Sequence, residues 1–128
     1  MYVATRAVVY DPDAGEYLPL DPERLAGVSA RLHGAFRTEV FGPLVAAVSG
    51  RSLLGDVVGI DGTSVILTAP VVASIADAFD AADLAAASAD ARWSRETLED
   101  AQELHRLLRL CREVGGALRT ERSLTRFR

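Results

Sequence analysis

β-Branched and aromatic residues dominate residues 2–10 of the chain (YVATRAVVY), which predicts a β-strand. A turn signal follows, because Pro12 presets its own backbone angle and Gly15 can adopt a positive φ. Residues 16–20 then return as a second, shorter strand. Since Pro19 has no N–H to donate, this strand should be very short or lie at a sheet edge. The N-terminal pattern therefore predicts a β-hairpin.

A helical pattern comes next. Asp21 can cap a helix, and Pro22 suits the first helical position, where its missing N–H costs nothing. Apolar residues then recur at steps of three and four: Leu25, Val28, Leu32, Phe36 and Val40. Gly42-Pro43 should end or kink this helix.

The clearest local signal spans residues 57–67, where two β-rich runs flank Asp61-Gly62. Asp-Gly is favoured in type I′ turns, so this segment predicts a second hairpin. Thr68 then looks like an N-cap, with Pro70 in the first turn of a helix that runs to about Ser88. The expected buried stripe is Val71, Ile75, Ala78 or Phe79, and Ala82, which leaves Asp77, Asp80 and Asp83 on the solvent side.

Residues 57–79, with their "DG…VILTAPVVASIADAF" run, are similar to a pattern in short uncharacterised proteins of actinobacteria and their phages. The likeness covers about a fifth of the chain and consists of a hairpin that leads into a capped helix. It implies no active residue.

The longest predicted helix runs from about 95 to 114, with Ser94 as its cap and Gly115-Gly116 as its stop signal. We expect one globular domain over residues 1–116, followed by an arginine-rich tail at 117–128 that is extended, frayed or partner-dependent. The fold class should be α+β, in the order ββα-ββα-α. It would hold two β-hairpins, which could form one four-stranded antiparallel sheet, and three main helices.

Composition argues against several kinds of chemistry. The chain of 128 residues has no lysine, which excludes a Walker-A loop or a Schiff-base lysine. Its single cysteine, Cys111, should be a buried small apolar residue, and it cannot form an intrachain disulfide or a multi-cysteine zinc site. His33 and His105 match no metal-ligand spacing, although the fold could bring Cys111 and His33 together. We therefore expect neither a metal nor another cofactor, and no catalytic residue.

The location of the protein is expected to be cytoplasmic, without contact with a membrane. No secretory signal is recognisable at the N-terminus, and no apolar run approaches the ~18 residues of a membrane span.

The net charge of −4 conceals an uneven distribution. Residues 92–128 hold nine arginines and six acids, whereas residues 1–91 hold five arginines and twelve acids. A basic C-terminal third on an acidic body suits docking to a partner, because complementary potentials steer association.

These patterns favour a small non-catalytic bacterial or phage-type interaction module, with an immunity, inhibitor or assembly-adaptor role. It would bind a protein partner or form a homo-oligomer. The last helix is apolar around much of its circumference, so one side could face a partner, or the sheet and the Ala-rich helix could cover both sides. The expected contact surface is Arg106, Leu107, Arg109, Leu110, Arg112, Arg119 and Arg122. The alternative is an accessory protein that binds nucleic acid through the same C-terminal arginines.

Overall fold

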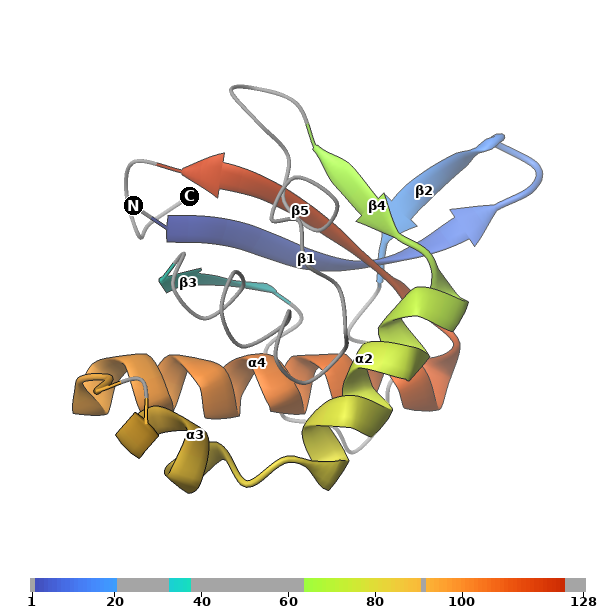
Figure 1. Cartoon of the computed structure of the whole chain (residues 1–128). Helices are drawn as coiled ribbons and strands as arrows, with labels where there is room; N and C mark the ends of the chain where they lie inside the picture. The colour runs from blue at the N-terminus through green and yellow to red at the C-terminus, as the bar shows by residue number, and fades with distance from the viewer. Residues whose placement is uncertain (1, 21–32, 38–63, 91, 124–128) are drawn as a thin grey trace.

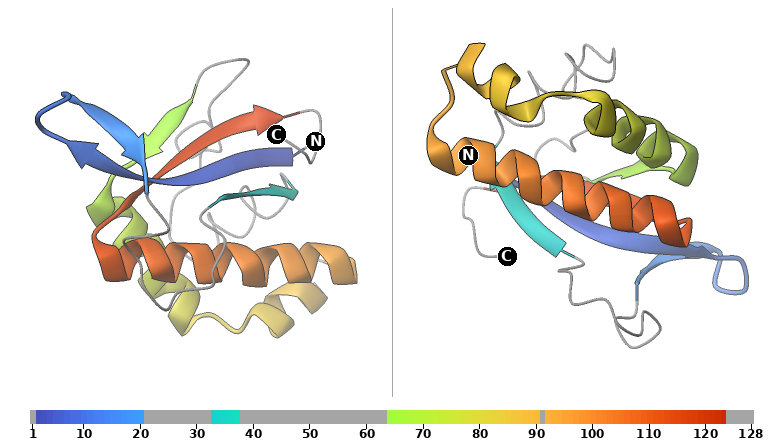
Figure 2. Two further views of the ribbon diagram at one scale, coloured as in Figure 1. Left: turned by 180° about the vertical axis from the view of Figure 1, so that it is seen from behind. Right: turned by 90° about the horizontal axis from the view of Figure 1, so that it is seen from below.

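The computed structural model describes residues 2–20, 33–37, 64–90 and 92–123. These residues form an antiparallel β-sheet with helices against one of its faces (Figure 1). The two further views show the same two layers, with the helices together on one side of the strands (Figure 2). The expected α+β class is confirmed.

The predicted N-terminal hairpin is present. Strand β1 (Tyr2–Asp11) pairs with β2 (Glu16–Pro19) in a register that places Asp11 opposite Glu16. The Asp11 side chain stabilises the turn, because its Oδ1 accepts the backbone N–H of Asp13 at 2.9 Å. Gly15 has a φ of 68°, the left-handed conformation expected of it.

Strand β3 (His33–Arg37) corrects the prediction of a helix through residues 25–40. It pairs antiparallel with the first half of β1, on the same edge that β2 uses farther along. Pairing with β1 provides hydrogen-bond partners for the backbone groups of both strands. This stabilisation outweighs the weak helical propensity of a segment that contains Gly34. The rest of the predicted helix, including Asp21 and Pro22, lies outside the described residues.

The second predicted hairpin is described only in its second strand, β4 (Val65–Leu67). This strand pairs antiparallel with β5, so Leu67 lies opposite Leu118. Asp61-Gly62 and the run before it lie outside the described residues.

The single helix expected after Thr68 is two helices, α2 (Ala69–Ala81) and α3 (Leu84–Asp90). Thr68 is at the N-cap position as predicted, but its side chain makes no capping hydrogen bond. The helix ends at Ala82, whose backbone is extended. Ile75 and Phe79 of the expected stripe are buried, and the other buried positions of α2 are Val72 and Ala76, whereas Val71 and Ala82 are half-buried. The stripe is rotated because α2 packs against both α4 and the sheet.

Helix α4 (Arg95–Val114) has the predicted ends. At its start, Ser94 Oγ accepts the Thr97 N–H at 3.2 Å and satisfies one of the unpaired donors of the first turn. At its end, Gly115 has a φ of 67°, so the chain leaves the helix in the left-handed conformation.

Strand β5 (Ala117–Ser123) corrects the expectation of a C-terminal tail that begins at residue 117. It lies between β1 and β4 and pairs antiparallel with both. Leu118 and Thr120 are completely buried. An extended conformation was one of three expectations for this segment, beside a frayed or partner-dependent tail. The segment is an interior strand because it pairs with β1 and β4, which lie far away in sequence.

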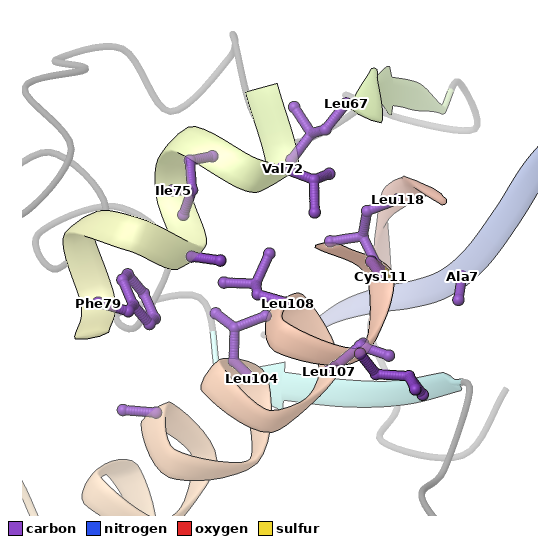
Figure 3. Packing of buried hydrophobic residues seen from close by; sticks show 13 residues of the cluster. Ala7, Leu67, Val72, Ile75, Phe79, Leu104, Leu107, Leu108, Cys111 and Leu118 are labelled. Carbon is purple, nitrogen blue, oxygen red and sulfur yellow. The ribbon is translucent and has the colours of Figure 1, made fainter. Parts of the chain in front are cut away.

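The hydrophobic core lies between the sheet and the α2–α4 pair (Figure 3). Phe79 and Ile75 of α2 meet Leu104 and Leu108 of α4, and Leu118 of β5 closes the core on the sheet side. A chain of this size can bury enough apolar area this way to be stable without disulfides or metals.

Candidate functional site

The two leucines predicted as partner anchors belong to the core. Leu107 is 3% exposed and Leu110 is 5% exposed, and both pack in the same cluster as Leu104 and Cys111. The broad apolar circumference of α4 is therefore explained by burial within the fold, and these two side chains do not lie on an interaction surface.

The arginines of α4 are engaged with acids of the same chain. Arg106 pairs with Glu103, one turn before it. Arg112 Nη1 donates to Asp80 Oδ2 at 2.6 Å and to Asp77 Oδ1 at 2.7 Å, so it joins α4 to α2. Arg109 Nε lies 3.8 Å from Asp80 Oδ1. Arg106, Arg109 and Arg112 are thus each within ion-pair distance of a carboxylate of the same chain.

Asp77, Asp80, His105, Arg109 and Arg112 make up what we call the α2–α4 charged cluster. Asp80 is its centre, because His105 Nε2 contacts Asp80 Oδ1 at 2.6 Å while Arg112 binds the other oxygen. The hydrogen bond from Arg112, followed by that from His105, lowers the pKa of Asp80 below its usual range. The Asp80 and Asp77 carboxylates in turn raise the pKa of Arg112. The cluster therefore joins α4 to α2 through side-chain hydrogen bonds and ion pairs.

His105 also packs edge-on against Phe79, with ring centroids 5.7 Å apart. An Asp–His pair of this kind orients a general base in hydrolases, where a nucleophile lies beside the second ring nitrogen. Cys111 is not the nucleophile of such a pair, because its thiol lies in the core and donates to Ala117 O at 3.8 Å. Together with Arg109 and Arg112, the Asp80–His105 pair forms a network of hydrogen bonds and ion pairs between α2 and α4.

Cys111 is completely buried, as the sequence predicted. Burial raises the pKa of its thiol to about 12, so the thiolate that nucleophilic chemistry needs is strongly disfavoured. The possible pairing of Cys111 with His33 concerns a side chain outside the described residues.

Arg119 and Arg122 lie on β5 rather than in a tail. The backbone of Arg119 pairs with Arg6 on one side and Ile66 on the other, and that of Arg122 pairs with Val3. Arg119 is half-buried, and the side chain of Arg122 is outside the described residues. The predicted contact surface is thus divided between the outer side of α4, the core and the sheet.

The β1–β2 hairpin carries an apolar surface that the sequence did not single out. Beyond the helices, the hairpin projects from the body of the molecule (Figures 1 and 2). Val9 is 36% exposed and Tyr10 is 52% exposed, and they are the exposed large hydrophobic residues of the described chain. Tyr10 and Tyr17 form a cross-strand pair with ring centroids 5.3 Å apart and an interplanar angle of 62°.

Acidic residues surround this aromatic pair. Asp11, Asp13 and Glu16 all lie at the turn, and residues 7–20 contain no arginine. Asp13 and Glu16 are exposed. We call residues 9–17 the hairpin tip. A signal for it was present in the sequence, because the turn at 12–15 places Tyr10 opposite Tyr17 once the hairpin register is drawn.

A scan against protein-family models matches no family, and searches of the curated proteins and of the solved structures find no significant match to this chain.

Within the ranges that the structure describes, no three histidine, cysteine or acidic side chains gather as metal ligands would. None of the described helices combines the length and the apolar character needed to cross a bilayer.

Proposed function

We propose that this protein is a small non-catalytic interaction module that binds another protein through the hairpin tip. The observation that carries the proposal is the exposed Tyr10, packed edge-on against the half-buried Tyr17, on a hairpin that projects beyond the helices. Tyrosine is enriched at protein interfaces because it offers a large contact area at little entropic cost. An immunity, inhibitor or assembly-adaptor role in a bacterium or a phage fits such a module.

The hairpin tip is apolar on both of its faces. Successive residues of a strand point to opposite sides, so Tyr10 and Tyr17 share one face while Val9 and Leu18 share the other. Four consecutive cross-strand pairs, from Val8–Pro19 to Asp11–Glu16, hold the two strands in register. A pre-ordered hairpin of this kind can enter an apolar recess without a large cost of ordering.

The negative charge of the hairpin tip indicates which kind of partner surface it can bind. With three acids and no arginine, it repels nucleic-acid phosphates and attracts a basic surface. The partner we propose is therefore a different protein that presents an apolar recess bordered by arginine or lysine. A symmetric contact between two copies would bring the two acidic tips together, which disfavours it.

The decisive experiment identifies the partner and then measures its affinity. A photo-crosslinking residue at position 14, beside the aromatic pair, should capture the partner in the host cell. The affinity of the purified partner is then measured by calorimetry for the wild type, for Tyr10→Ser and for the control Gln102→Ala, an exposed position of α4 outside the hairpin tip. Loss of a central aromatic contact commonly costs about 2 kcal/mol, so Tyr10→Ser should bind roughly 30-fold more weakly while Gln102→Ala binds normally.

The same affinity should fall as salt is raised, and Asp13→Asn with Glu16→Gln should reduce that dependence. Equal binding by Tyr10→Ser and the wild type would refute the hairpin tip as the binding surface. The alternative function makes a different prediction: a short DNA duplex would bind at low salt, and replacement of the exposed arginines in Arg106→Gln with Arg109→Gln would weaken that binding.

A further inference from the structure

Two arginines face each other across the centre of the sheet. Arg6 of β1 and Arg119 of β5 are direct cross-strand partners. Side chains in such positions have Cβ atoms roughly 5 Å apart, and like charges placed there destabilise a sheet unless something compensates them. The register thus places two arginines directly beside each other on neighbouring strands.

Both arginines lie on the sheet face away from the helices. Their neighbours Ala7 and Leu118, one residue along each strand, belong to the core that α2 and α4 cover. Because side chains alternate along a strand, Arg6 and Arg119 must lie on the opposite face. Ile66 of β4 is the next cross-strand neighbour of Arg119 on that face.

The Arg119 guanidinium is incompletely satisfied. Its Nε is buried, yet it has no hydrogen-bond partner among the residues that the structure describes. Among the described residues, neither Arg6 nor Arg119 forms an ion pair with an acid. A buried donor without a partner is costly, and such a group commonly marks a ligand, ion or water site.

We infer that Arg6 and Arg119 form a binding site for a phosphate-type oxyanion on the face of the sheet opposite α2 and α4. A guanidinium presents a planar fork of N–H donors that matches the oxygens of phosphate, and two such groups can neutralise a dianion. A carboxylate carries a single charge and would neutralise one of them. The ligand class is therefore a phosphate monoester or free phosphate, and the site does not depend on the partner of the hairpin tip.

Binding is tested with inorganic phosphate on the full chain, at constant ionic strength maintained with sodium chloride. The Arg119 Nε–Hε signal in a ¹⁵N-correlated NMR spectrum, assigned by its loss in Arg119→Gln, should shift on titration. Arg6→Gln should weaken the affinity at least about tenfold, because it removes charge-assisted hydrogen bonds to the oxyanion. The matched control is Arg95→Gln, which removes an exposed arginine of α4 and should leave the affinity unchanged.

The titration is repeated with acetate and with phenyl phosphate to distinguish the oxyanion sources. Phosphate and phenyl phosphate should bind more tightly than acetate. Equal affinities in the wild type, Arg6→Gln and Arg95→Gln would mean an adventitious ion only and would overturn the proposal. So would the absence of any shift of the Arg119 signal at millimolar phosphate. If Arg119→Gln fails to fold, the comparison of Arg6→Gln with Arg95→Gln decides the question.

Discussion

Arg112 of α4 donates a hydrogen bond of 2.6 Å to Asp80 of α2, and this contact joins two helices that are far apart in sequence. The same nitrogen also reaches Asp77 at 2.7 Å, so one guanidinium spans successive turns of α2. Asp77 and Asp80 were expected to lie on the solvent side, and both are solvent-exposed. Their role in the structure is nevertheless to orient α2 on α4.

Asp80→Asn should lower the melting temperature at neutral pH by a few degrees, because it removes the charge that both Arg112 and His105 contact. The pKa of Asp80 is lowered in the folded state, so its stabilising effect is full above the ordinary aspartate pKa of about 3.9. It is lost as the pH falls through the lower folded-state value. The difference between the wild type and Asp80→Asn should therefore shrink in acid, as thermal unfolding at a series of pH values will show.

The exposed Asp90→Asn is the control for this series, since Asp90 lies at the end of α3 away from the charged cluster. A difference for Asp80→Asn that stays constant down to strongly acidic pH would contradict the proposed ion-pair network.

Cys111 should not react with a thiol reagent in the folded protein. Its side chain is completely buried, and its pKa is raised to about 12, so almost no thiolate exists at about pH 8, where a free cysteine titrates. Labelling with Ellman's reagent should be complete in denaturant and negligible in native buffer. Rapid labelling of the native protein would show that the thiol is accessible and would revive a chemical role for Cys111.

Leu107→Ala should affect stability and leave the intrinsic affinity of the folded protein for a partner unchanged. Leu107 is 3% exposed, so truncation leaves a cavity between α4 and its neighbours. Such a substitution typically lowers the free energy of unfolding by about 2–5 kcal/mol, which urea denaturation would measure. Gln102→Ala, on the exposed side of the same helix, should change it by less than about 0.5 kcal/mol. If Leu107→Ala left the free energy of unfolding unchanged, Leu107 would not be a core residue and could again be assigned to the interaction surface.

Gly115→Ala should destabilise the fold through the backbone alone. A Cβ at Gly115 would meet no atom within 4 Å, but the φ of 67° is strained for alanine by about 1–2 kcal/mol. Gly115→Asn should cost less, because asparagine tolerates the left-handed conformation. Equal losses for the two variants in denaturant unfolding would point to a steric cause instead of the backbone angle.

Several local features followed directly from the sequence. The turn of the first hairpin, the Ser94 cap, the Gly115 stop and the burial of Cys111 each depend on residues close together in the chain or on the character of one side chain. Short-range sterics and hydrogen bonding decide such features, so their residue types reveal them.

Other features depended on contacts distant in sequence. Strands β3 and β5 form because each pairs with β1, one on each edge of that strand. The local sequence of neither segment shows that β1 will be its partner. From the sequence, Leu107 and Leu110 could lie either on a partner surface or in the core. The packing of α4 shows that they are buried. The hydrogen bond between Arg112 and Asp80 depends on how α4 packs against α2. The pairing of Arg6 with Arg119 depends on the register of β1 and β5. The sequence by itself determined where elements begin, turn and end, whereas only the tertiary structure decided which faces meet, because burial and cross-strand pairing are properties of the whole fold.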